Sequence, residues 1–452
     1  MTSETVPATP SQRAFSVVAE ELFLQQRRVD PFGHRLHAWL AAVWCFLACS
    51  PTSFLELGIL PVGICFLIRL PRHIRTDGRL LHLPTIWFAL AWIAWIWASL
   101  SWSSNASIGI EEAGAARFAF ALVLLWPVLD RRTLLIKALL LGFLAANVAQ
   151  AFHAIGTAFN IESITFPRMP HRNSGWWQPV VGGTMLTAGL GLHLPAMLTG
   201  KGRVRVIGFL GVLLCIVGVI ATGSRGAWLA SASLCVIALV WGLTRRGWPR
   251  VSWGHLPLIG ALGVVLAVGG YKTLWPTLSE RGRAGIVEVR RAITDKDYTS
   301  DTGARILMAQ MAIDALVQKP LNGIGAGSFK GWGRGHLADL GREKEARLIP
   351  DHAHNTFLHV AATTGVVGVV LFGGLIILSV RGGFWTPRAS ADETDARAKI
   401  AGYEAGPVFG LIGLVLASPF IVIQVDAQPS AMLWILIVLC LRGRPAEVSA
   451  PS

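Results

Sequence analysis

A histidine followed by an asparagine ends the longest polar stretch of the sequence. The residues from Asp351 to Asn355 lead directly into an apolar segment at 355–380. Histidine accepts a proton near neutral pH, so His354 is the candidate general base, and Asn355 could orient its ring or a substrate. Alternatively, His354 only hydrogen-bonds a loop carbonyl. His352 adds another alternative, a metal site with Asp351, although no third ligand has clear local spacing.

Three arginines stand where loops meet apolar segments, and each could bind an anion. Arg225 follows Ser224 in a glycine-rich turn between two apolar segments. Glycines let the backbone approach a ligand there, and the amides at the start of the next helix favour an anion. Arg305 opens an amphipathic stretch, where a cation opposes the helix dipole unless an anion binds. Arg172 precedes the segment at 179–199. The alternative for each is an interfacial or solvated arginine.

Arg117 lies inside the apolar segment at 114–130. Charged side chains at such depth usually face the protein interior, which makes Arg117 a further candidate for substrate binding. Pairing with Glu111 or Glu112 is the alternative. Several arginines and one histidine on the same surface predict a ligand with two negative charges, such as a lipid-borne diphosphate.

The sequence offers little for a metal or another cofactor. Asp295 and Asp297 have the spacing that could hold Mg²⁺, but a solvated loop turn is the preferred interpretation. Guanidinium groups then replace the metal, and the predicted site has no cofactor. The six cysteines all lie in or at the ends of apolar segments, which indicates packing residues rather than ligands or disulfides.

The composition indicates that these residues are positioned by membrane helices. Of 452 residues, 53% are hydrophobic and only 15% are charged, which is too apolar for a soluble globular protein. The net charge of +14 does not indicate nucleic-acid binding, because the excess lies in short clusters between apolar segments.

Twelve apolar segments are candidate transmembrane helices, although counts of ten or eleven remain open. They are 37–53, 55–70, 80–101, 114–130, 132–153, 179–199, 204–222, 225–244, 254–273, 355–380, 403–424 and 428–442. The predicted fold class is therefore an all-α polytopic membrane protein with about twelve transmembrane helices and one large, partly helical loop. Arginine clusters follow every second segment, for example at 201–205 and 245–250. This alternation predicts that both termini are cytoplasmic and that the large loop is on the outer side.

The predicted organisation has five parts. They are a cytoplasmic tail at 1–36, helices 1–9 at 37–273, the large loop at 274–354, helices 10–12 at 355–442 and a second tail at 443–452. Within the loop we expect a helix that Asp301 or Thr302 caps and that ends before Pro320. A glycine-rich turn at 321–329 follows it, and a second helix is expected at 336–347.

Three motifs carry a resemblance to a known family. They are Ser224-Arg225-Gly226-Ala227, then Arg305 followed by Pro320-Leu-Asn-Gly323-Ile-Gly325-Ala-Gly327-Ser-Phe329, and finally His354-Asn355-Thr-Phe357-Leu358 with Gly365 and Gly368. In their order, spacing and topology, over about 172–375, they resemble the O-antigen ligase and polymerase superfamily, and the ligases most. One departure is Gln178-Pro179, where the family often has Asn-Pro.

The resemblance implies a glycosyltransferase of the bacterial inner membrane whose large loop and active site face the periplasm. The donor would be an O-antigen polysaccharide on undecaprenyl diphosphate, and the acceptor the lipid A core oligosaccharide, with no metal or nucleotide. It implies that His354 is the catalytic base of an inverting transfer. Arg225 and Arg305, with Arg172, would contact the diphosphate or the sugar.

Other functions remain open. An O-antigen polymerase is one, because Arg172 and Gly183 have the Arg-x10-Gly spacing associated with those enzymes. A protein O-oligosaccharyltransferase would differ only in its acceptor. A lipid-linked sugar flippase, which is not an enzyme, should show ionisable residues deep in several helices or paired broken half-repeats. The sequence shows neither.

Overall fold

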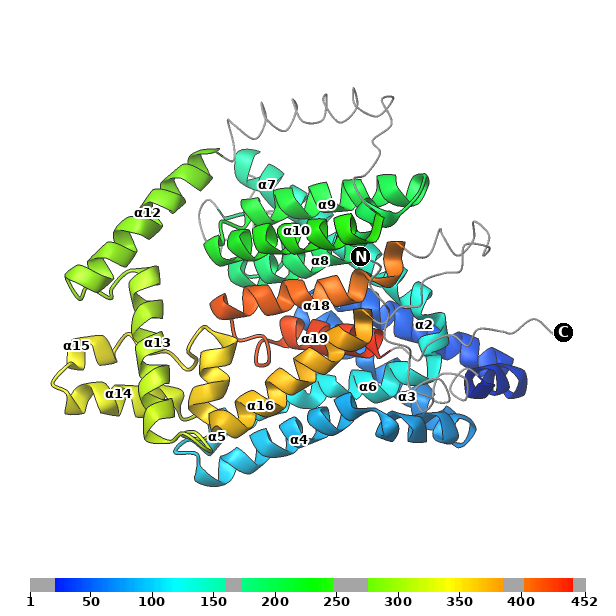
Figure 1. Ribbon diagram of the computed structural model, residues 1–452, viewed down its shortest axis with the longest axis horizontal. Helices are drawn as coiled ribbons and strands as arrows, with labels where there is room; N and C mark the ends of the chain where they lie inside the picture. Colours follow the sequence, from blue (N-terminus) through cyan, green and yellow to red (C-terminus); the bar gives the residue numbers. More distant parts are fainter. Residues whose placement is uncertain (1–20, 160–171, 247–274, 385–401, 442–452) are drawn as a thin grey trace.

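The computed structural model describes residues 21–159, 172–246, 275–384 and 402–441, and all regular structure within them is helical (Figure 1). Eight helical stretches in this part of the chain are long and apolar enough to cross a membrane. They are Thr52–His82, Pro84–Trp102, Ala106–Thr157, Pro179–Thr199, Arg203–Ala221, Arg225–Thr244, Thr356–Phe384 and Gly402–Phe420. The chain is therefore an all-helical, multi-pass membrane protein.

The predicted count of about twelve spans is not confirmed. The segments at 114–130 and 132–153 lie in one helical stretch of 52 residues, in which two helices meet at a kink at Val128 without a loop between them. The segment at 37–53 is α2 (Pro31–Leu47), with 17 residues, and that at 428–442 is α19 (Ala427–Cys440), with 14 residues. With 14 residues α19 is too short for a full span, and α2 is at the lower limit of length and is not among the eight stretches. The segment at 254–273 lies outside the described residues.

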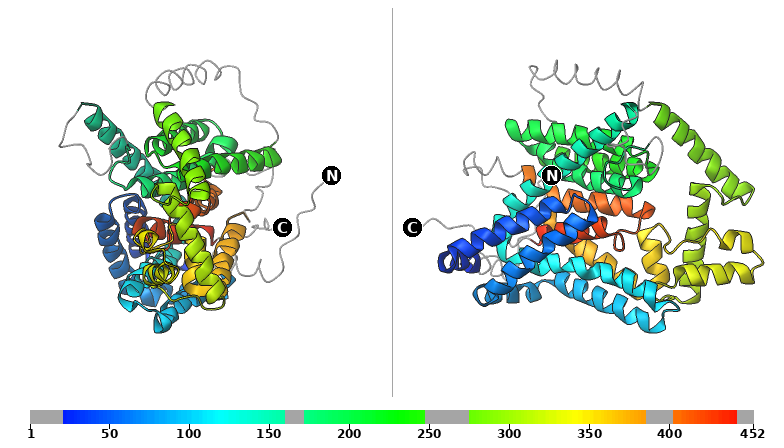
Figure 2. Two further views of the ribbon diagram at one scale, coloured as in Figure 1. Left: turned by 90° about the vertical axis from the view of Figure 1, so that its left-hand side faces the viewer. Right: turned by 180° about the vertical axis from the view of Figure 1, so that it is seen from behind.

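The centre of the bundle is built around α8 (Pro179–Thr199), which is buried almost throughout. It packs against α9 (Arg203–Ala221), α10 (Arg225–Arg246) and α18 (Gly406–Ala417). Figure 2 shows these helices lying side by side. Small residues in α8 let neighbouring backbones approach, as is usual between membrane helices. The positions of α9, α10 and α18 therefore fix where their connecting turns meet.

Four helices form a polar layer at one end of the bundle, at the left of Figure 1. They are α12 (Trp275–Thr294), α13 (Asp301–Gln318), α14 (Phe329–Asp339) and α15 (Glu343–Ala346). They share a small apolar core that includes Leu307, Met311 and Phe329. The large loop is thus a helical cap with its own packing rather than an extended connection.

The loop helix predicted after Asp301 is confirmed, but its cap is different. The hydroxyl of Ser300 accepts a hydrogen bond from the Gly303 backbone N–H at 3.1 Å, so neither Asp301 nor Thr302 caps the helix. The second predicted helix, at 336–347, is replaced by α14 and α15. The prediction placed no helix at α12.

The glycine-rich turn at 321–328 fills a break in α16 (Thr356–Phe384). This helix is interrupted at Gly365, which removes part of its hydrogen-bond ladder. The turn supplies the missing partners: Ile324 N–H donates to the Ala362 carbonyl at 2.9 Å, and Val366 N–H donates to the Pro320 carbonyl at 2.8 Å. Backbone groups inside a membrane protein need such partners. The turn therefore holds the first part of α16 in place.

Gly327 anchors the other side of this turn. Its φ is +77°, and a Cβ atom at this position would lie 2.2 Å from the backbone nitrogen of Gly109 in α5 (Ala106–Gly114). Only a glycine allows this approach between two backbones. The turn thus ties α5 to α16.

We expect Gly327→Ala to lower the free energy of unfolding by about 1–3 kcal/mol, because both the left-handed backbone and the contact with Gly109 oppose a side chain. Gly335 in α14 is the matched control, since a Cβ there meets no atom within 4 Å. Gly335→Ala should be neutral or stabilising by about 0.5–1 kcal/mol. Thermal unfolding of the purified variants in detergent measures the difference. Equal midpoints for the two variants would contradict the anchor.

Candidate active site

His354 lies in the connection between α15 and α16 and is half-buried. Its φ is +47°, in the left-handed region that residues other than glycine seldom adopt. Such a conformation persists only when the surrounding structure holds it, and it is common at functional sites. The contacts on either side of His354 therefore decide where its ring is placed.

The residues after His354 are fixed to two other elements. The Asn355 side-chain oxygen accepts a hydrogen bond from the Leu358 backbone N–H at 3.1 Å, so Asn355 caps the start of α16. The Thr356 hydroxyl donates to the Ile421 carbonyl at 2.7 Å and accepts from the Ile423 N–H at 3.0 Å. The connection between α18 and α19 is therefore tied to the loop that carries His354.

Arginines surround the turn between α9 and α10. Arg172 Nε donates to the Thr222 carbonyl at 2.9 Å, and Arg281 Nη1 donates to the Gly223 carbonyl at 3.1 Å. Arg225, which starts α10, donates from Nη1 to the Arg281 carbonyl at 3.2 Å. Three guanidinium groups thus belong to one hydrogen-bonded assembly.

Gly223 makes the close packing of these arginines possible. Its φ is +63°, and a Cβ atom there would lie 3.3 Å from Arg281 Nε and 3.4 Å from Arg172 Cγ. A larger residue would be strained and would displace both side chains. The glycine next to Ser224 therefore serves packing of the arginines in this structure, and Ser224 itself is buried in the turn.

Arg305 reaches the same region from α13. Its Nη1 donates to the Phe420 carbonyl at 3.0 Å, and the Phe420 ring packs directly on Gly226, the residue after Arg225. Burial lowers the pKa of Arg305, and Arg225 acts in the same direction while Asp301 opposes it. The three arginines proposed from the sequence, Arg172, Arg225 and Arg305, therefore lie together, and Arg281 joins them.

Mutual repulsion is evident at Arg172. Burial lowers its pKa to about 10, and the charges of Arg281, Arg305 and Arg225 add to this effect, whereas Asp301 opposes it. An anion bound among these guanidinium groups would relieve their repulsion. We refer to Arg172, Arg225, Arg281 and Arg305 as the arginine cluster.

One carboxylate already occupies part of the arginine cluster. Glu288 on α12 accepts a hydrogen bond from Arg225 Nη2 at 2.8 Å and from the Thr302 backbone N–H at 3.3 Å. Burial alone would raise the pKa of Glu288, but these hydrogen bonds and the charge of Arg225 lower it. Four arginines therefore meet two nearby carboxylates, Glu288 and Asp301, and positive charge remains in excess.

His354 lies next to the arginine cluster and is neutral. Burial lowers the pKa of His354 to about 4, and the charge of Arg305 acts in the same direction. A neutral imidazole has a lone pair that can accept a proton. The geometry thus combines a cationic cluster with a proton acceptor.

Arg117 is not part of this site. Its side chain is 46% exposed and pairs with Glu56, and its guanidinium group lies 4.6 Å from the centre of the Phe118 ring. The expectation that Arg117 faces the protein interior is therefore wrong, and so is its alternative pairing with Glu111 or Glu112. Arg117 can reach Glu56 because both side chains project from the bundle surface.

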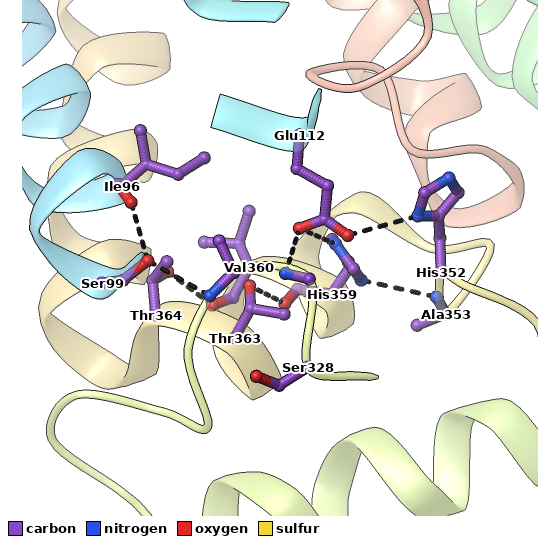
Figure 3. A network of polar contacts seen from close by, with 12 residues as sticks. Ile96, Ser99, Glu112, Ser328, His352, Ala353, His359, Val360, Thr363 and Thr364 are labelled. Atoms are coloured by element: carbon purple, nitrogen blue, oxygen red, sulfur yellow. Dashed lines mark hydrogen bonds and ion pairs between the residues drawn. The ribbon is translucent and has the colours of Figure 1, made fainter. Parts of the chain in front are cut away.

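A second cluster of titratable side chains lies close to the His354 loop, and the sequence analysis did not predict it. Glu112, 2% exposed, is 3.5 Å from His352 Nδ1 and 3.5 Å from His359 Nε2 through its two oxygens (Figure 3). The signal was present: a carboxylate and a histidine inside apolar segments usually have a specific partner. Asp351, the sequence-based metal partner of His352, pairs instead with Lys330 at 3.1 Å.

Glu112, His352 and His359 could also hold a metal ion, because their ligand atoms lie within 4.8 Å of one another. One contact argues against that chemistry. The Ala353 backbone N–H donates to His359 Nδ1 at 3.5 Å, which leaves the proton of a neutral ring on Nε2. That nitrogen faces Glu112 and is then a donor rather than a ligand. The arrangement therefore fits a cluster of paired polar groups better than a metal centre.

The predicted Mg²⁺ pair has a structural use. Asp297 accepts hydrogen bonds from the Thr299 backbone N–H at 3.0 Å and from the Thr299 hydroxyl at 2.6 Å. Lys296 between the two aspartates has a φ of +54°. The segment is therefore a loop turn that Asp297 stabilises.

Fold and site together define a multi-pass membrane protein with a cluster of arginines and an adjacent neutral histidine. Residues 210–373 match the family model described as O-antigen ligase, so the resemblance is confirmed over this part of the chain. The match runs from within α9 to within α16 and contains Arg225, Arg281, Arg305 and His354. Arg172 precedes it. No curated protein matches the chain.

We expect Arg281→Ala to weaken binding of undecaprenyl diphosphate about 10- to 100-fold, the typical loss for one charge-assisted hydrogen bond. Arg283, exposed on the same helix, is the matched control, and Arg283→Ala should bind normally. Binding is measured by displacement of a fluorescent diphosphate lipid from the purified protein. Equal affinities for the two variants would remove Arg281 from the anion site.

Proposed function

We propose that the protein transfers O-antigen polysaccharide from undecaprenyl diphosphate to the lipid A core oligosaccharide. The transfer would be inverting and metal-independent and would occur at the periplasmic face of the bacterial inner membrane. One observation carries this proposal: four arginines from distant parts of the chain converge, one of them (Arg305) beside His354, and three of the four lie with His354 in the region that matches the O-antigen ligase family.

The arginine cluster suits the diphosphate of the donor. A diphosphate between a lipid and a sugar is dianionic, and planar guanidinium groups bind its oxygens in pairs. The excess positive charge beyond Glu288 and Asp301 could neutralise it. During transfer the bond from the anomeric carbon to the diphosphate breaks, and negative charge grows on the leaving oxygen. Donors already in place stabilise that charge.

His354 suits the acceptor. Its neutral ring would take the proton from a sugar hydroxyl of the lipid A core as that oxygen attacks the anomeric carbon. The new carbon–oxygen bond forms opposite the diphosphate, which leaves with the electron pair of the broken bond, so the anomeric configuration inverts. Asn355 caps α16 and could contact a substrate through its amide N–H groups.

Reconstitution with purified lipid-linked polymer and two acceptors tests the function. Transfer to core lipid A supports the ligase. Transfer only to a second lipid-linked repeat would identify a polymerase, and transfer only to a protein would identify an oligosaccharyltransferase. Movement of the donor across the membrane without any transfer would instead identify a flippase.

We expect His354→Ala to lower the transfer rate by about 100- to 10,000-fold, the usual contribution of a general base. Donor binding should be unchanged, because it depends on the arginine cluster. His354→Asn should fail equally, since an amide does not accept a proton at neutral pH. Polymer transfer in proteoliposomes measures the rates. The assignment fails if folded His354→Ala transfers at a near wild-type rate while His352→Ala does not.

We expect the transfer rate to stay level from pH 8 to about pH 5 and to fall as the pH approaches 4. The reason is that the lowered pKa of His354, about 4, keeps the base deprotonated well below the ordinary histidine value of 6.5. Between these values the unfolded chain binds more protons, so this residue also makes folding less favourable as the pH drops. Initial rates at saturating donor test this, and a half-maximal rate near pH 6.5 would contradict it.

A further inference from the structure

Glu112 contacts the segments on both sides of His354 and not the arginine cluster's own hydrogen-bonded groups. It lies on α5, more than two hundred positions before His354, and its side chain is 2% exposed. One oxygen, Oε2, accepts a hydrogen bond from the Gly327 backbone N–H at 2.9 Å. The same oxygen is 3.5 Å from His359 Nε2, and Oε1 is 3.5 Å from His352 Nδ1. Glu112 therefore joins α5, the glycine-rich turn and the loop that precedes α16.

One backbone contact decides which nitrogen of a neutral His359 ring carries the proton. The Ala353 N–H donates to His359 Nδ1 at 3.5 Å, so this nitrogen is an acceptor. The proton of a neutral ring is then on Nε2, the nitrogen that faces Glu112 at 3.5 Å (Figure 3). A chain of polar contacts, which we call the relay, therefore runs from Glu112 through His359 to the backbone of Ala353. The next residue is His354, with its left-handed backbone.

The relay holds the loop at two points. His359 fixes the backbone immediately before His354, and His352 fixes the loop two residues before it. A buried carboxylate is costly unless it is paired, so Glu112 favours the conformation in which both histidines face it. Without the negative charge of Glu112, neither His352 nor His359 would be attracted to this position.

We propose that Glu112 is a positioning residue that holds the His354 loop in its reactive conformation through His359 and His352. The proposal rests on the assignment of His354 as the base. Glu112 touches neither the donor nor the acceptor, and it acts only through the two histidines. A shift of about 1 Å in a reacting group can cost about 100-fold in rate.

Glu112→Gln tests this role, with Glu111→Gln as the matched control because Glu111 is the exposed neighbour on the same helix. We expect Glu112→Gln to lower kcat about 10- to 100-fold and to leave the KM for the donor unchanged. Glu111→Gln should match the wild type in both constants. A folded Glu112→Gln variant with wild-type kcat would overturn the proposal.

A pair of substitutions at His359 keeps the test decisive if Glu112→Gln does not fold. Glutamine can accept from the Ala353 N–H through its oxygen and donate to Glu112 through its amide, as the neutral ring does. His359→Gln should therefore retain most of the turnover, whereas His359→Ala should lose it. Equal loss in both variants would contradict the relay.

Two further measurements separate this proposal from its alternatives. Modification of His354 by diethyl pyrocarbonate, followed by mass spectrometry, should be several-fold faster in Glu112→Gln than in Glu111→Gln, whether or not the protein transfers polymer. That difference together with an inactive wild type would refute the proposed function and leave the positioning role supported. The zinc content of the two purified proteins is the second measurement. One zinc per chain in the wild type and none in Glu112→Gln would replace the relay with a metal centre.

Discussion

The arrangement of the site depends on how like charges are held together. Each guanidinium group of the arginine cluster donates to a backbone carbonyl: Arg172 to Thr222, Arg281 to Gly223, Arg225 to Arg281 and Arg305 to Phe420. Thr222 and Gly223 follow the last turn of α9, and Phe420 ends the helical turn after α18. Carbonyls at helix ends carry partial negative charge. Carbonyls after α9 and after α18 therefore hold Arg172, Arg281 and Arg305, whereas Arg225 is held by a carbonyl inside α12. The packing of α8, α9, α10 and α18 sets the positions of the first two groups of carbonyls.

Much of the site could be predicted from the sequence, because its residues lie at recognisable junctions. Arg225, Arg305, Arg172 and His354 each lie where a loop meets a helix, and the structure brings the three arginines together beside His354. Arg281 was missed because α12 is an amphipathic helix with several arginines, and local pattern does not single one out. Glu112 and His359 were missed because their contact joins residues far apart in the chain, which only the packing of α5 against the glycine-rich turn reveals.

The fold class could likewise be predicted from apolar segments, but the number of spans could not. A hydropathy pattern records where a segment is apolar and not whether the chain leaves the membrane between two segments. At 126–131 a 3-10 turn with a kink at Val128 leads directly into α7 (Arg132–Phe159), so the two predicted segments meet without a loop between them. At Gly365 the reverse occurs. The apolar segment is continuous in sequence, but the helix is interrupted where the glycine-rich turn inserts.

His354 lies between two charge systems, and their separation explains its protonation state. A carboxylate close to a histidine raises its pKa, as happens to His352, where Glu112, Asp426 and Asp351 outweigh the lowering by burial. Burial lowers the pKa of His354, and the charge of Arg305 lowers it further. Glu112 contacts His352, His359 and the Gly327 N–H, so in the proposed role the carboxylate orders the loop without protonating His354. A positioning carboxylate that acts through neighbouring histidines would thus combine a fixed His354 ring with an available lone pair.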